Sequence, residues 1–115
     1  MNETVRCPRG AMLDTWSGHQ WQDGIQLETL DDLCKVTVLT ENSTYEMTVI
    51  CARTGEILIR GGRFFTEFTQ ARLGGSSLGG SFLKVRGIYV GFSMEIHTED
   101  KWIVTSRVRS IAPEG

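Results

Sequence analysis

The sequence predicts an all-β protein, a small antiparallel barrel or sandwich of about six strands with at most one or two short helical turns. Three observations support this prediction. Apolar and polar residues alternate over several short segments, turn-forming residues separate these segments, and thirteen glycines are spread over 115 residues. Because glycines suit sharply bent strands, the barrel is favoured over the sandwich.

The chain is expected to form a single domain, in which residues 1–24 are an irregular arm and residues 25–111 a β-rich core. The arm lacks periodicity and contains Trp16 and Trp21. An aromatic arm could bind a partner. Large aromatic side chains are costly to leave in water, however, so a cap over an open end of the core is favoured.

Leucines spaced three apart over residues 27–33 predict a short helix, with Thr29 as its cap, or a strand that leads into such a helix. A period of two then runs over residues 34–38 and predicts a strand. Residues 41–43 are turn formers, and the alternation returns over residues 45–51. These two strands are therefore expected to form a hairpin.

A glycine-containing turn at residues 52–55 leads to a third strand over residues 56–60, which a glycine pair ends or bends. Residues 63–81 are expected to form a long connection that is apolar in places. One helical turn is expected within this connection, at residues 69–73.

The last third of the chain shows the clearest alternation. A strand is expected over residues 82–86, and strict alternation from Ile88 to Ile96 predicts another. A turn at residues 98–101 then reverses the chain. In the returning strand, one face is expected to carry Trp102, Val104, Ser106 and Val108, and the other Ile103, Thr105, Arg107 and Arg109.

The formal net charge of −2 offers no bulk attraction to nucleic acid or to an anionic membrane. No apolar run approaches the roughly 18 residues that span a bilayer, and the first residues lack the basic and apolar regions of a signal peptide. A cytoplasmic protein with no membrane partner is therefore expected.

The three cysteines are odd in number and widely spaced, so no disulfide framework is expected. Cys34 and Cys51 occupy apolar positions of predicted strands. At such positions a free cysteine usually behaves as a small buried hydrophobe.

The sequence carries no catalytic signature. Its two histidines are far apart, and His97 lies near Glu95 and Glu99, which is typical of an exposed polar face rather than a metal site. No G-x-S-x-G elbow is present. We therefore assign no catalytic residue, no metal and no cofactor, and an enzyme is a minority hypothesis.

A Gly/Ser-rich stretch between flanking cations is the candidate binding site. Its backbone N–H groups and hydroxyls could wrap an anion, and the guanidinium groups beside it could bind a phosphate or a carboxylate. The stretch lacks the Lys-Ser/Thr pair of a P-loop. The alternative is a mere connector beside solvated arginines. The candidate ligand-binding residues are Arg60, Arg63, Arg72, Gly75, Ser76, Ser77, Gly79, Gly80, Ser81 and Lys84.

The hairpin over residues 34–51, followed by Thr54-Gly55 and a further strand, resembles small SH3-like or Sm-like barrels in the spacing of its strands. This resemblance covers under half of the chain. It implies a fold and not a function, because one fold hosts many unrelated functions.

Function hypotheses from different classes follow. The first is a non-catalytic barrel module that binds a small anionic ligand or a protein partner through residues 60–86. The second is a homo-oligomeric accessory or structural protein, such as a homodimer, because Leu39, Leu58 and Ile103 are expected on outer faces that a second subunit could cover. A nucleic-acid-binding barrel is a weaker third hypothesis, disfavoured by the acidic balance.

Overall fold

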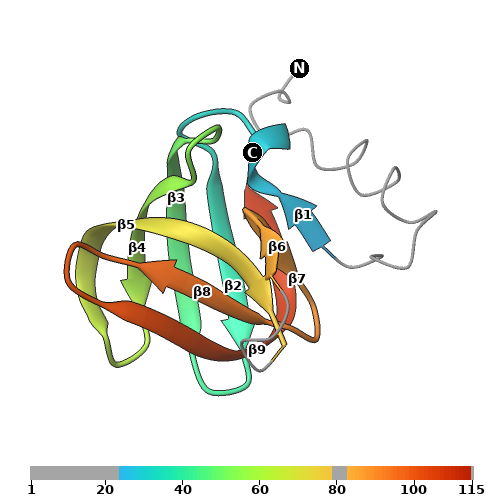
Figure 1. The fold of residues 1–115 in the computed structure, drawn as a ribbon, viewed down its shortest axis with the longest axis vertical. Coiled ribbons are helices and arrows are strands. Elements are labelled where there is room, and N and C mark those ends of the chain that lie inside the picture. The colour runs from blue at the N-terminus through green and yellow to red at the C-terminus, as the bar shows by residue number, and fades with distance from the viewer. Residues whose placement is uncertain (1–23, 79–82, 115) are drawn as a thin grey trace.

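The computed structural model describes residues 24–78 and 83–114 (Figure 1). The predicted arm and the candidate residues Gly79, Gly80 and Ser81 lie outside this range. The elements are β1 (Gly24–Gln26), the 3-10 helix η2 (Leu27–Thr29), β2 (Lys35–Thr40), β3 (Thr44–Cys51), β4 (Glu56–Gly61), β5 (Phe65–Ser77), β6 (Leu83–Val85), β7 (Gly87–Tyr89), β8 (Ser93–His97) and β9 (Trp102–Glu114).

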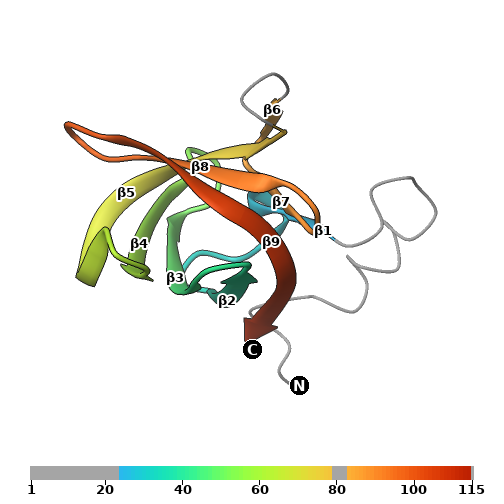
Figure 2. The same cartoon turned by 90° about the horizontal axis from the view of Figure 1, so that it is seen from below.

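The protein is an all-β barrel. Seven strands form one sheet in the order β4-β3-β2-β9-β8-β5-β6, and a further pairing of β4 with β5 closes six of them into a ring. Every strand pair in the described residues is antiparallel. Figure 2 shows the strands of the ring curving around a common interior. The predicted fold class is confirmed.

The barrel interior is filled by alternate side chains of the ring strands, as their period of two predicts. The confirmed hairpin of β2 and β3 contributes four apolar residues that are at most 2% exposed, and β4, β5 and β8 contribute five more. These fully buried side chains are Val36, Val38, Met47, Val49, Ile57, Ile59, Leu73, Met94 and Ile96.

The expected connection over residues 63–81 is instead the long strand β5, so that prediction is wrong. The first half of β5 pairs with β4, and the second half pairs with β8 and β6. The ladder shifts between Leu73 and Gly75, where the φ angle of Gly75 is +143°. A bulge of this kind bends a strand, which is how one continuous strand can border two neighbours.

The assignment of faces in β9 is also corrected. Ile103 is 5% exposed and Thr105 is buried, whereas Trp102 and Val104 are 68% and 51% exposed. The register explains the difference, because β9 has one more residue than β8 between their flanking pairs, Glu95 with Val104 and Ser93 with Arg107. One extra residue reverses the facing of everything beyond it. Val108 is buried, as its predicted face requires.

A small sheet of β1 and β7 packs at one end of the ring. The amide of Leu27 donates to the carbonyl of Arg86 at 2.9 Å, and the Tyr89 hydroxyl donates to Gln26 Oε1 at 2.7 Å. Thr29 ends η2 rather than capping a later helix, and its hydroxyl donates to the carbonyl of Gln26. The expected strand from Ile88 to Ile96 is split into β7 and β8 by a turn.

The cysteines differ from expectation. Cys34 is buried as predicted, but it is disulfide-bonded, so the expectation of free thiols at both strand positions is wrong. Cys51 is a free, partly exposed thiol at the end of β3. In the described residues no helix is long and apolar enough to cross a bilayer. The cytoplasmic location stays a prediction.

Candidate functional site

The structure distributes the predicted site residues over the barrel rather than gathering them in one loop. Ser76 and Ser77 are fully buried in β5. The Ser76 hydroxyl donates to the carbonyl of Gly87 at 2.9 Å and accepts from the amide of Tyr89 at 3.1 Å. A Cβ on Gly75 would lie 2.2 Å from the carbonyl oxygen of Lys84. This part of the stretch therefore builds the framework between β5, β6 and β7.

Two of the predicted arginines lie away from that framework. Arg60 of β4 donates from Nε to Glu46 Oε1 at 2.9 Å, and its guanidinium sits 4.5 Å from the centroid of the Phe68 ring. Arg63 is exposed in the turn between β4 and β5. Because β4 rises by about 3.3 Å per residue, Arg60 lies roughly 13 Å along the strand from Glu56.

Arg72 of β5 occupies a different position, at the centre of a row of four side chains. Its register partners are Glu56 on β4 and His97 on β8, and His97 pairs in turn with Trp102 on β9. Directly opposed residues lie about 5 Å apart on neighbouring strands. The row therefore places a carboxylate, a guanidinium, an imidazole and an indole side by side across four strands.

Three members of the row, Glu56, Arg72 and His97, line a surface hollow of about 510 Å³, which we call the Arg72 groove, and Trp102 lies next to His97 at its border. One wall is the turn between β8 and β9, where the Thr98 hydroxyl accepts from the amide of Lys101 at 3.0 Å and holds the turn in place. The lining residues are Glu56, Gln70, Ala71, Arg72, His97, Thr98 and Glu99.

A second arginine reaches the same corner of the barrel. A Cβ on Gly55 would lie 3.5 Å from both Arg72 Cγ and Arg86 Cγ, so the two side-chain stems flank one point of the turn. The φ angle of Arg86 is +56°, a left-handed conformation that is uncommon for a residue with a side chain. Arg86 Nε lies 3.5 Å from Glu28 Oε1.

Glu28, which is itself exposed, joins a polar network with the buried residues Gln26 and Tyr89. Gln26 donates from Nε2 to Glu28 Oε2 at 3.1 Å and to the carbonyl of Val85 at 3.0 Å, and it accepts from the Tyr89 hydroxyl. Burial raises the pKa of Tyr89 to about 12, and the charge of Glu28 adds to this rise. The network therefore keeps a carboxylate beside Arg86 and leaves Arg72 as the less constrained cation.

His97 and Trp102 form the aromatic end of the row. Their ring centroids are 4.9 Å apart and the ring planes are tilted by 56°. His97 Nε2 is buried and has no hydrogen-bond partner among the described residues, and a Cβ on Gly74 would lie 3.2 Å from it. The missing side chain at Gly74 therefore leaves room for the imidazole against which Trp102 packs.

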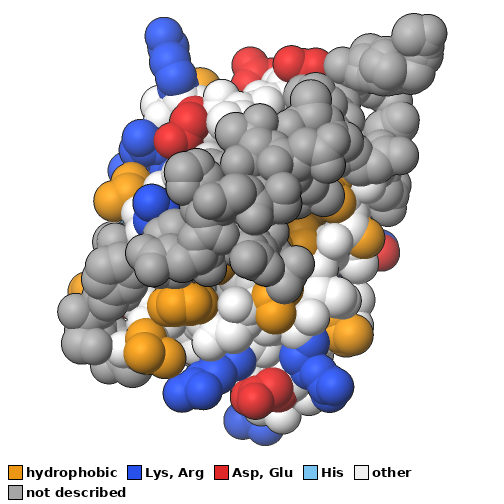
Figure 3. Space-filling view, turned by 90° about the vertical axis from the view of Figure 1, so that its right-hand side faces the viewer, with side chains coloured by type: hydrophobic (Ala, Val, Ile, Leu, Met, Phe, Trp, Pro, Cys, Tyr) orange, Lys and Arg blue, Asp and Glu red, His pale blue; other side chains and the backbone are white. Residues whose placement is uncertain are grey.

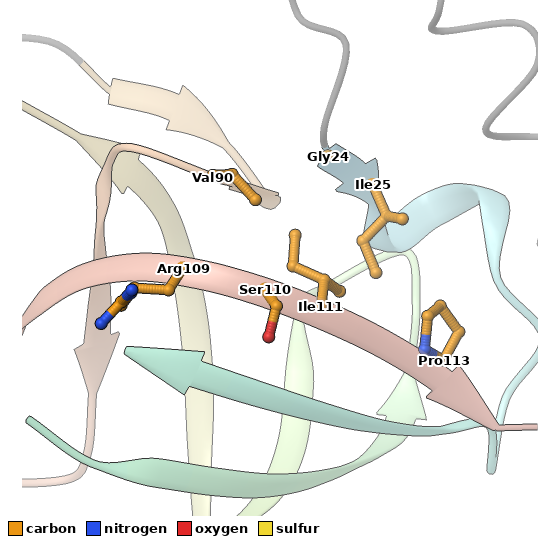
Figure 4. A pocket seen from close by; sticks show the side chains of 7 residues that line it. All are labelled: Gly24, Ile25, Val90, Arg109, Ser110, Ile111 and Pro113. Atoms are coloured by element: carbon orange, nitrogen blue, oxygen red, sulfur yellow. The ribbon is translucent and has the colours of Figure 1, made fainter. Parts of the chain in front are cut away.

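A second hollow, of about 350 Å³, lies between β1 and β9. Figure 4 shows Ile25, Val90 and Ile111 directed toward its centre, while Arg109 and Ser110 project elsewhere. Figure 3 views the β1, β6 and β7 side of the molecule, where hydrophobic side chains reach the surface between charged ones. The hollow borders residue 24, where the described range begins, and we do not assign it as a site.

Sequence reasoning identified Arg72 but not its neighbours. One signal for them was available, because residues 97 and 102 flank a predicted four-residue turn and must oppose each other in a hairpin. Glu56 and Arg86 carried no such signal, since their approach to Arg72 depends on the register of β5 and on the turn at Gly55. Lys84 lies on β6 opposite Ser76.

No protein-family model matches the chain, and comparisons with curated proteins and with solved structures find no match. Within residues 24–78 and 83–114, no three His, Cys, Asp or Glu side chains gather as a metal site would require.

Proposed function

We propose that this protein is a non-catalytic barrel module that binds a small anionic ligand, a phosphate or a carboxylate, in the Arg72 groove. The position of Arg72 carries this proposal. Within the described residues the ion pairs join Arg60 to Glu46 and Arg86 to Glu28, so the exposed guanidinium of Arg72 is in neither. It lines a hollow large enough for a small molecule.

Arginine suits this role because its planar guanidinium can donate two parallel hydrogen bonds to a phosphate or a carboxylate. Glu56 and Glu99 also line the groove, and their charges oppose a ligand with many anionic groups. The groove therefore favours one anionic group at Arg72, which disfavours a nucleic-acid backbone.

The test uses inorganic phosphate as a probe, titrated into the whole protein at low ionic strength and followed by amide chemical shifts. We expect shifts centred on residues 55–56, 72 and 97–99, and loss of binding in Arg72→Ala. Arg107→Ala is the matched control, because Arg107 is exposed on β9 outside the groove. Equal phosphate affinity in the two variants, or no binding by the unmodified protein, would reject the proposal.

A homo-oligomer is the second candidate function, and the exposure of Trp102 and Val104 favours it. These two residues project from the outer face of β9, and an exposed apolar pair of this kind is common at subunit contacts. Sedimentation of the purified protein tests this candidate. A dimer that Val104→Glu converts to a monomer would support it, and a monomer at all concentrations would exclude it.

A further inference from the structure

We infer that the ligand of the Arg72 groove carries a flat ring as well as its anionic group, as a nucleoside monophosphate does, and that the ring stacks on Trp102. This inference rests on the proposed function and names the class of its ligand. The ring would contact Trp102 at one end of the row of four side chains, and the anionic group would contact Arg72, two strands away.

Trp102 has the properties of a stacking platform. Its side chain is 68% exposed, but its ring packs against the imidazole of His97, and this contact restricts the movement of the indole. The missing side chain of Gly74 leaves room for His97 at this position. The indole is therefore in contact with the tilted imidazole on one side, while most of its surface is open to a ligand. Any nucleic-acid base can stack on such a ring, and this stacking contributes substantially to the free energy of binding.

The spacing of the row sets the size of the ligand. Arg72 and Trp102 are separated by one intervening strand, and strands lie about 4.8 Å apart, so the two positions are roughly 10 Å apart. This separation matches the reach from a phosphate through a ribose to a base. A free phosphate or a simple carboxylate would occupy only the Arg72 end.

The charges of the groove agree with a monophosphate. Glu56 adjoins Arg72 and Glu99 lies at the turn wall, so additional phosphates would meet carboxylates rather than cations. The same carboxylates, together with Gln70, can accept hydrogen bonds from ribose hydroxyls or from an exocyclic amine. A ligand with one anionic group, a polar linker and a flat ring can therefore interact with every member of the row.

Four probes test the inference by calorimetric titration: AMP, adenosine, ribose 5-phosphate and inorganic phosphate. We expect AMP to bind at least ten-fold more tightly than inorganic phosphate or ribose 5-phosphate. Trp102→Leu should lower the affinity for AMP to that for inorganic phosphate. The affinity for inorganic phosphate itself should not change. Phe64→Leu is the matched control, because Phe64 is an exposed aromatic residue that lies outside the row of four side chains.

The outcomes separate the inference from the proposed function. If phosphate binds and Arg72→Ala abolishes that binding, while AMP gains nothing over ribose 5-phosphate, the ring contact is rejected and the anion site stands. If Trp102→Leu leaves the preference for AMP intact, stacking on Trp102 is also rejected. If none of the four probes binds, both the inference and the proposed function fail. Far-ultraviolet circular dichroism of each variant confirms that the barrel is folded.

Discussion

Tyr89 and Ser76 are joined inside the barrel by a hydrogen bond from the Tyr89 amide to the Ser76 hydroxyl, 3.1 Å long. The same hydroxyl donates to the carbonyl of Gly87, so one side chain links β5 to both ends of β7. These bonds fasten the small end sheet to the ring. A serine that looks like a ligand-binding residue in the sequence therefore serves the framework.

Ser76→Ala should consequently destabilise the fold rather than weaken binding. It leaves the buried amide of Tyr89 and the carbonyl of Gly87 without their partner, at a cost of about 1–3 kcal/mol. Urea denaturation measures this loss. Ser110→Ala is the control, because Ser110 is exposed and its change should stay within about 0.5 kcal/mol. Similar midpoints for the two variants would contradict the assigned role.

Gly61 and Gly91 allow steric and conformational effects to be separated. Both have positive φ angles, but a Cβ on Gly61 would lie 2.1 Å from the carbonyl oxygen of Thr44, whereas one on Gly91 would meet nothing within 4 Å. Gly91→Ala should cost about 1 kcal/mol, and Gly61→Ala more than about 3 kcal/mol. Thermal unfolding measures the loss of stability in each variant. Equal losses would show that the backbone near Gly61 moves to make room for the added Cβ.

Ionisation of Tyr89 should destabilise the protein at alkaline pH. Its pKa is raised to about 12 in the folded protein, from an ordinary value of 10.0, so the unfolded chain loses the proton first. The contribution of Tyr89 to stability is therefore complete below pH 10, and it is lost as the pH rises toward 12. Unfolding measured across this range should show the decline, and Tyr89→Phe should reduce its slope. An unchanged slope would contradict the raised pKa.

Arg60→Ala should have little effect on stability and none on phosphate binding. Its ion pair with Glu46 is about half exposed, and exposed pairs contribute at most about 1 kcal/mol. A double-mutant cycle with Glu46→Ala measures this coupling by urea denaturation. Loss of phosphate binding in Arg60→Ala would place the anion on the outer face of β4 and not in the Arg72 groove.

Cys51 should be more reactive than an ordinary thiol. Hydrogen bonding from the Thr54 side chain, with a smaller contribution from its backbone, lowers the pKa of Cys51, so more of the reactive thiolate is present at neutral pH. The rate of alkylation by iodoacetamide as a function of pH gives the pKa directly. Thr54→Val should raise it, and an unchanged profile would exclude Thr54 as the cause.

The sequence predicted the parts of the fold in which alternation is uninterrupted. The hairpin of β2 and β3 is such a part, because Val36, Val38, Tyr45, Met47 and Val49 alternate on its buried face. Bulges explain the failures. β5 has extra residues opposite the end of β4 and a shift at Gly75, and β9 has one extra residue near Ser106, so neither strand shows a continuous period of two.

The candidate site was predictable only in part for the same reason. Arg72 stood out as a cation beside a glycine-rich stretch. Its relation to Glu56, His97 and Trp102 is a matter of register across four strands, and register depends on bulges that the pattern of apolar residues does not reveal. The stretch itself was misread because glycine and serine are common both in loops and at bends in strands.

The pairing of β9 with both β8 and β2 has a consequence for biosynthesis. β2 begins at residue 35, and its neighbour β9 in the ring ends at residue 114, so the barrel cannot close until β9 has been synthesised and has left the ribosome. Until then β2 has an unpaired edge, which is a site for association with other chains. Closure must also bring distant segments together, and such topologies fold in milliseconds to seconds. The nascent chain is therefore exposed to aggregation during the interval in which a chaperone would act.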